Sequence, residues 1–144
     1  MSEQHKQTVI RWFEEVWNKG RRDAIDEMLP ADCVIHDGEA AWRGPEEFKP
    51  FFDRMRASFS DIRVTSEHAI AEGDVVCLRW SVSMRHTGDG MGMPATDKEV
   101  SITGMSLVRF ADGRFAECWQ NWDMYGMMQQ INEATKAKAY MTAE

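Results

Sequence analysis

Apolar residues recur along the first third of the chain at intervals of three and four, which is the spacing of an amphipathic helix. This pattern predicts a helix over residues 4–19 and a shorter one over 24–29, which Pro30 ends. A brief apolar run over 33–36 then predicts a short strand. The chain therefore begins with helices and meets its first strand only after them.

A third helix is predicted to begin at Gly44-Pro45, because proline is favoured at the first helical position and two glutamates follow in the first turn. Pro50 lacks a backbone N–H, so we expect a kink there or a later helix start. The predicted inner face of this helix comprises Phe48, Phe51, Phe52, Met55 and Phe59.

From residue 62 onward apolar and polar residues alternate, which is the period of a strand. Turns near Gly73 and Gly113 divide this part into long strands. The predicted strands are 62–70, 75–86, 100–110 and a last one from residue 115. Helices followed by an antiparallel meander indicate one α+β domain over 1–144, with 133–144 as a helical tail. Curved strands with the N-terminal helices on one side would form a conical half-barrel that encloses a pocket.

The segment 115–131 changes from the period of a strand to that of a helix, and Asp123 lies at the change. Because side chains alternate, one side of the strand should carry Phe115, Glu117, Trp119, Asn121 and Asp123. A carboxylate among aromatic rings is poorly solvated, which would raise its pKa and allow it to carry a proton near neutral pH. The alternative is that Asp123 caps the helix that follows, since aspartate is a favoured N-cap.

Polar residues also lie at the ends of other apolar strands, and they are His36, Asp37, His86 and Asn121. Each has a structural alternative, because a histidine can pack at the rim of a core and His36-Asp37 can form a turn. Their convergence with Asp123 on one aromatic space favours acid/base chemistry on an organic substrate. His86, His36 and Asp123 are therefore the candidate catalytic residues.

The predicted pocket draws its lining from helices, strands and one long loop. The expected lining residues are Trp17, Phe52, Trp80, Trp119, Asn121, Asp37, Met91 and Met93. The loop 87–97 is rich in glycine and methionine, which predicts a lid whose methionines touch the ligand. The alternative is that both methionines pack permanently against the sheet edge or a dimer partner.

The composition argues against several classes of function. The net charge of −7 argues against a nucleic-acid partner and against an anionic membrane surface. No apolar run approaches the length of a membrane span or a signal peptide, so the expected location is the cytoplasm. The three cysteines are widely separated and the four histidines show no metal-binding spacing, so we expect neither a redox motif nor a metal site.

Several segments resemble the SnoaL-like polyketide cyclases, also called ester-cyclase-like, of the NTF2-like superfamily. They are RWFEEVWNKGRRDAIDEML, CVIHDG, GPEEFKPFFDRMRASFSDIRV and HTGDGMGMPATDKEVSITGMSLVRFADGRFAECWQNWDMYGMMQQI, and the resemblance covers nearly the whole chain, up to about Asn132. The resemblance implies a conical α+β barrel with a deep apolar pocket, often dimeric, that works without a cofactor. It also implies that Asp123 matches the acidic residue that acts as general acid/base near the end of the last long strand. His36 and His86 match stretches that border the pocket, whereas Cys118 stands where many relatives carry histidine.

The expected function is a cofactor-independent acid/base enzyme acting on an apolar, carbonyl-bearing small molecule. The reaction would be an intramolecular aldol closure, as in polyketide cyclases, or an isomerisation. The alternative is a non-catalytic protein that binds a small hydrophobic or aromatic molecule in the same pocket. A homodimer is expected to form through the outer face of the sheet, where Cys77, Leu107 and Val108 offer apolar material.

Overall fold

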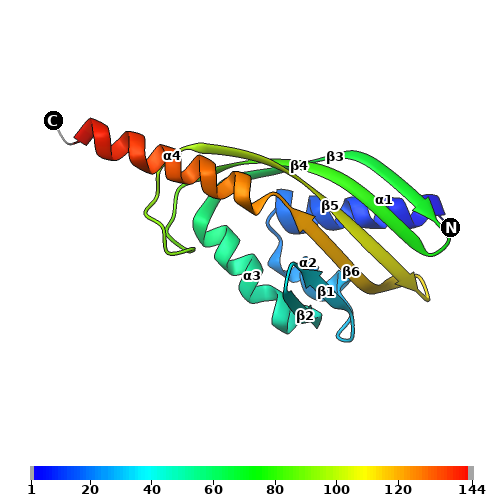
Figure 1. Ribbon diagram of the computed structural model, residues 1–144. Coiled ribbons are helices and arrows are strands. Elements are labelled where there is room, and N and C mark those ends of the chain that lie inside the picture. Colours follow the sequence, from blue (N-terminus) through cyan, green and yellow to red (C-terminus); the bar gives the residue numbers. More distant parts are fainter. Residues whose placement is uncertain (1, 143–144) are drawn as a thin grey trace.

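The computed structural model describes residues 2–142 (Figure 1). The helices are α1 (Ser2–Trp12), the π-helical turn η1 (Phe13–Asn18), α2 (Arg22–Met28), α3 (Gly44–Ser58) and α4 (Met124–Thr142). The strands are β1 (Val34–Asp37), β2 (Ala40–Arg43), β3 (Phe59–Glu72), β4 (Val75–His86), β5 (Glu99–Ala111) and β6 (Arg114–Trp122). Of the predicted tail over 133–144, the last two residues lie outside the described range.

The six strands form one sheet in the order β2-β1-β6-β5-β4-β3. Neighbouring strands run antiparallel except β1 and β6, which run parallel, so the predicted antiparallel sheet is in fact mixed. Figure 1 shows the sheet curving, with α1, α2 and α3 on one side of it. The predicted α+β architecture, a curved and unclosed sheet with helices on one face, is confirmed. None of the described helices has the length and apolarity needed to span a bilayer.

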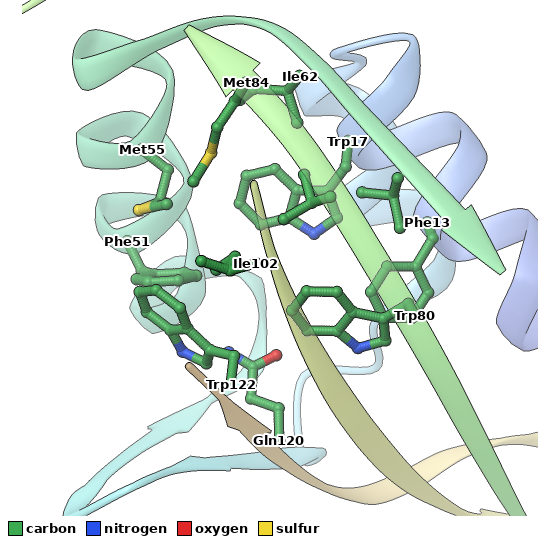
Figure 2. Close-up of a pocket in the computed structure, with 12 residues that line it drawn as sticks. Phe13, Trp17, Phe51, Met55, Ile62, Trp80, Met84, Ile102, Gln120 and Trp122 are labelled. Carbon is green, nitrogen blue, oxygen red and sulfur yellow. The ribbon is translucent and has the colours of Figure 1, made fainter. Parts of the chain in front are cut away.

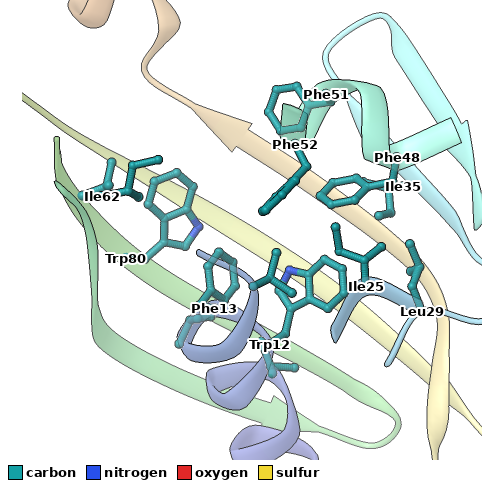
Figure 3. Packing of buried hydrophobic residues seen from close by; sticks show 14 of the residues in the cluster. Trp12, Phe13, Ile25, Leu29, Ile35, Phe48, Phe51, Phe52, Ile62 and Trp80 are labelled. Carbon is teal, nitrogen blue, oxygen red and sulfur yellow. The ribbon is translucent and has the colours of Figure 1, made fainter. Parts of the chain in front are cut away.

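The helix α3 begins at Gly44 as predicted and continues through Pro50, so its start is not delayed. Gly44 has φ +69°, and a Cβ there would lie 2.6 Å from the carbonyl oxygen of Ala31, so glycine is needed where the chain turns into this helix. The prediction that Phe59 belongs to the helix is wrong, because Phe59 begins β3. The core lies between the helices and the concave face of the sheet, and aromatic rings dominate it (Figure 3).

A β-bulge between β5 and β6 decides which side chains face that core. Arg109 pairs with Glu117 while Phe110 pairs with Phe115, so Ala116 is an extra residue on β6. An extra residue reverses the alternation of every side chain beyond it. Phe115 faces the core, but after the bulge the inward positions are Cys118, Gln120 and Trp122. Sequence periodicity alone predicted the opposite set.

Candidate active site

A cavity opens between the concave face of the sheet and the helices (Figure 2). It encloses about 510 Å³ of space between atoms, including its open mouth, and the centre of a water molecule can occupy about 60 Å³ of this. Its lining residues are Phe13, Trp17, Phe51, Met55, Ile62, Val64, Trp80, Val82, Met84, Ile102, Gln120 and Trp122. A narrow, aromatic slot of this kind favours a flat apolar ligand.

Trp80 forms one wall of the cavity and is held in place from two directions. Its Nε1 donates a hydrogen bond to Ser106 Oγ at 3.1 Å, which satisfies the indole in a buried setting. Its ring lies over Gly104, the residue paired with it on β5, where an added Cβ would come within 2.4 Å of the ring. The absence of a side chain at Gly104 therefore fixes how deeply the indole sits.

Another part of the wall comes from η1, which contributes Phe13 and Trp17; the Phe13 ring packs against that of Trp80, with centroids 5.9 Å apart. The side chain of Asn18 fastens this turn to β3: Val64 N donates to Asn18 Oδ1 at 2.6 Å, and Asn18 Nδ2 donates to Val64 O at 3.0 Å. A π-helical turn at a cavity wall is a common functional feature, because the wider winding re-aims the side chains that follow.

The polar end of the cavity is built on β1 and β6. Gln120 and Trp122 line the cavity, and both donate to the carboxylate of Asp37: Gln120 Nε2 lies 3.1 Å from Oδ2, and Trp122 Nε1 lies 3.1 Å from Oδ1. Figure 2 shows the Gln120 amide between the rings of Trp122 and Trp80. Burial raises the pKa of Asp37, and this outweighs the two hydrogen bonds and the charge of Arg54, which lower it.

Four of the predicted pocket residues lie at or beside this cavity. Trp17 and Trp80 line it, and Asp37 lies directly behind Gln120 and Trp122. Phe52 is buried in the core beside it, with its ring centroid 5.3 Å from that of Trp17.

Asp123 and Asn121 are both exposed, and neither lines the cavity. Asp123 Oδ1 accepts a hydrogen bond from Gly126 N at 2.8 Å, at the start of α4. This is the geometry of an N-cap, the alternative that the sequence left open. Asn121 pairs with the exposed Met105 on the outer face, because the bulge turns it away from the core.

His36 also projects to the outer face, where it pairs with Trp119. The two rings stack with centroids 5.4 Å apart, and His36 Nε2 lies 2.7 Å from Glu117 Oε2. Arg109 donates to the other oxygen of Glu117 at 3.3 Å. The structure therefore brings His36 together with Trp119, but does not bring His36 to the main cavity.

His86 is fully buried at the end of β4 and packs against Phe59, with ring centroids 5.4 Å apart. Thr96 N donates to His86 Nδ1 at 3.3 Å, and Nε2 has no hydrogen-bond partner among the described residues. Burial lowers the pKa of His86. Met91 and Met93 are partly buried and pack against the core, but they do not line the cavity.

Gln120 is the functional candidate that sequence reasoning missed. No motif marks it, and the uninterrupted alternation assumed for β6 placed it on the outer side. The signal that would have found it is the bulge, which appears only once β5 and β6 are paired.

Comparisons with known proteins agree with this architecture. Residues 7–131 match the model of the SnoaL-like polyketide cyclase family. The nogalonic acid methyl ester cyclase of Streptomyces nogalater is 30% identical over 123 residues, which cover 81% of this chain and 90% of that protein. An aklanonic acid methyl ester cyclase of Streptomyces peucetius is 28% identical over 132 residues, covering 87% and 89%. Among solved structures, a protein assigned as a SnoaL-like polyketide cyclase from Jannaschia superposes with a TM-score of 0.82 at 26% identity, covering 90% of this chain and 92% of that one.

Proposed function

Because the chain belongs to the SnoaL-like polyketide cyclase family, we propose that it closes a ring in a flat, carbonyl-bearing small molecule by a cofactor-independent intramolecular aldol reaction. One observation carries the proposal: a carboxylate with a raised pKa, Asp37, is held by two polar groups that line an otherwise apolar cavity. An acid/base group in a poorly solvated place is what proton abstraction beside a carbonyl requires.

In the proposed mechanism the substrate lies in the slot beside Trp80 with its reacting carbonyl at the polar end. Because Asp37 lies behind Gln120 and Trp122, its carboxylate removes a proton from the carbon next to that carbonyl through one intervening water molecule. The Gln120 amide has two N–H groups, one of which is engaged by Asp37, so the other donates to the enolate oxygen as charge develops there. The enolate carbon attacks a second carbonyl of the same molecule, and the new alkoxide recovers the proton from Asp37. The reaction is balanced without an oxidant or a second substrate.

The proposed acid/base is Asp37 rather than Asp123 because of position. Asp37 contacts two residues of the cavity lining, whereas Asp123 is exposed and engaged with the backbone of α4. The role that the sequence suggested for Asp123 stays a prediction, and one experiment separates the two residues.

The experiment measures turnover of aklanonic acid methyl ester and nogalonic acid methyl ester, the compounds for which the relatives are named. Loss of a general acid/base should lower kcat/KM of Asp37→Asn by about 100-fold or more. The matched control is Asp123→Asn, which keeps a good N-cap and should retain activity close to that of the wild type. Full activity in Asp37→Asn, or loss confined to Asp123→Asn, would contradict the assignment.

A non-catalytic binding protein is the second candidate, and the character of the lining favours it. All of the lining residues except Gln120 are apolar or aromatic, and none is charged. Calorimetry with the same two esters separates the candidates: a binder takes up ligand without forming product, and its affinity changes little in Asp37→Asn.

A further inference from the structure

Two of the three cysteines meet inside the protein although 85 positions separate them in the sequence. Cys33 immediately precedes β1 and Cys118 lies on the neighbouring strand β6, and their sulfurs are 4.0 Å apart. Both are free thiols, and Cys77 lies elsewhere, on β4.

The β6 bulge is what brings Cys118 inward toward Cys33. Cys33 is fully buried, and Cys118 borders a second, smaller cavity that shares Phe13 and Gln120 with the main one. The two cavities therefore adjoin at these two residues, so a small oxidant that enters the main cavity comes close to the cavity that Cys118 borders. No group of three or more His, Cys, Asp or Glu in the described part of the chain could hold a metal ion, so the thiol pair is not part of such a cluster.

The two thiols are chemically unequal. The contact between the two sulfurs lowers the pKa of Cys33 against the opposing effect of burial, and the same contact together with burial raises the pKa of Cys118. The close contact therefore favours loss of a proton from one sulfur while the other keeps its proton, which is the arrangement of an attacking and a resolving cysteine.

We propose that Cys33 and Cys118 are a reversible oxidation site that forms an intramolecular disulfide between β1 and β6 when the protein meets a peroxide. One sulfur of the pair, as its thiolate, attacks one oxygen of hydrogen peroxide, the O–O bond breaks, and the departing hydroxide takes up a proton as water. The other sulfur then attacks that sulfenic acid, the S–O bond breaks, and a second water leaves with the proton of the attacking thiol. Two thiols lose two electrons and the peroxide gains them.

The disulfide would act on the polar end of the main cavity. Forming it shortens the sulfur separation from 4.0 Å to about 2.0 Å, which draws β1 and β6 toward each other at the two cysteines. Asp37 and Gln120 are a directly opposed pair of the same ladder, two residues beyond the pair formed by Ile35 and Cys118. Oxidation should therefore disturb the hydrogen bonds that Gln120 and Trp122 donate to Asp37.

Peptide mass spectrometry tests the bond itself. The full-length protein and a Cys77→Ser variant are treated with hydrogen peroxide and then alkylated after unfolding. Both should show a linked pair of peptides that contain Cys33 and Cys118, and dithiothreitol should restore both thiols. Before alkylation, the intact mass should be lower by about 2 Da for the two hydrogens lost. Alkylation of both Cys33 and Cys118, sulfinic acid at either of them without a link, or a link through Cys77 would overturn the proposal.

The indole N–H resonances of the tryptophans test the effect on the cavity without any substrate. The Trp122 resonance should shift on oxidation, because its N–H donates to Asp37, and the Trp80 resonance should stay, because its N–H donates to Ser106 in another part of the sheet. A Cys118→Ala variant should show neither the link nor the shift. A linked protein whose Trp122 resonance does not move would overturn the coupling to the cavity.

Discussion

Asp37 and Gln120 stand directly opposite each other in the parallel pair β1–β6, and Gln120 Nε2 donates to Asp37 Oδ2 at 3.1 Å. The backbone ladder between the two strands therefore fixes the acid relative to the cavity, and neither residue depends on a loop for its position. Candidate catalytic groups held in this way keep their geometry better than groups on loops.

The raised pKa of Asp37 predicts how the stability of Asp37→Asn compares with that of the wild type at different pH values. Since burial raises this pKa in the folded state above the ordinary value of 3.8, the folded protein binds the proton more tightly than the unfolded chain. The stabilisation from the protonated form is fully present below pH 3.8 and is lost as the pH rises through the raised pKa. The difference in free energy of unfolding, Asp37→Asn minus wild type, should therefore increase with pH across this window and then level off. Urea titrations at a series of pH values measure this difference.

Asp53 supplies a control in which the dependence of stability on pH has the opposite sign. Its hydrogen bonds with Arg22 lower its pKa, so its contribution to stability is present above the ordinary value and is lost as the pH falls. Asp53→Asn should therefore lose stability relative to wild type as the pH rises. A flat difference between Asp37→Asn and wild type across the same titration would show that burial does not perturb Asp37.

The contact between Trp80 and Gly104 predicts the effect of a single methyl group on the cavity. A Cβ at position 104 would lie 2.4 Å from the Trp80 ring, so Gly104→Ala should push the ring into the slot. Overpacking of this kind costs about 1–3 kcal/mol of stability, and the narrowed slot should bind aklanonic acid methyl ester more weakly. Thr103→Ala, an exposed change one residue away, should alter neither quantity. Unchanged affinity in a folded Gly104→Ala protein would show that the ligand does not use this wall.

Much of the fold could be predicted from the sequence, because long periodic segments determine their own type. Proline and glycine marked the start of α3 and the β3–β4 turn, and the alternation from Val76 to His86 identified the buried face of β4. The short strand β2 was not predicted, because its residues Ala40–Arg43 are mostly exposed and show no alternation.

The site was predicted less well because two features depend on pairing between strands. The bulge at Ala116 reverses the faces of β6, which moves Trp119 and Asn121 outward and brings Gln120 in. The parallel pair β1–β6 joins Asp37 to Gln120 over 83 positions, a distance at which no local pattern carries information. Residues whose position followed from one strand alone, such as Trp80, were placed at the cavity from sequence.

We expect the protein to form a homodimer through the outer face of the sheet. A row of residues in register crosses five strands on this face, and it comprises Ile70, Cys77, Leu107, Trp119 and His36. Ile70 is 67% exposed and Leu107 is 39% exposed, so the row is apolar surface without cover in the single chain. Val108, also considered from sequence, faces the core instead.

Sedimentation checks the dimer. The wild type should sediment at micromolar concentration with twice the 16.6 kDa mass of the chain, and Leu107→Lys should sediment as a monomer because a buried lysine would be unpaired. Ala111→Lys adds the same charge at an exposed end of β5 and should stay dimeric. A wild-type protein that is monomeric under these conditions would contradict the prediction.

The hydrogen bonds of the loop 87–97 predict slow hydrogen exchange of its backbone amides. The loop would then stay closed permanently, as a seal, whereas its composition alone predicted a mobile lid. Thr87 N and Gly88 N both donate to Ser58 O at 3.1 Å, and Asp97 N donates to His86 O at 2.8 Å. A Cβ at Gly88 would come within 1.9 Å of the Ala57 carbonyl oxygen, so this glycine serves close approach to α3 rather than backbone freedom. The amides of Thr87, Gly88 and Asp97 should therefore be protected in the free protein.

Two glycine variants separate the seal from the lid. Gly88→Ala should lower stability by about 1–3 kcal/mol and speed exchange through the loop, because the methyl group has no room beside α3. Gly92→Asn is the control: a side chain at position 92 meets nothing within 4 Å, and asparagine tolerates the φ of +81° there better than other residues do. Fast exchange from Thr87 to Met93 in the free wild type, slowing when aklanonic acid methyl ester binds, would instead establish the lid. In that case the hydrogen bonds to Ser58 would have to break each time a ligand enters, and Gly88→Ala would raise the rate of ligand entry rather than merely destabilise the fold.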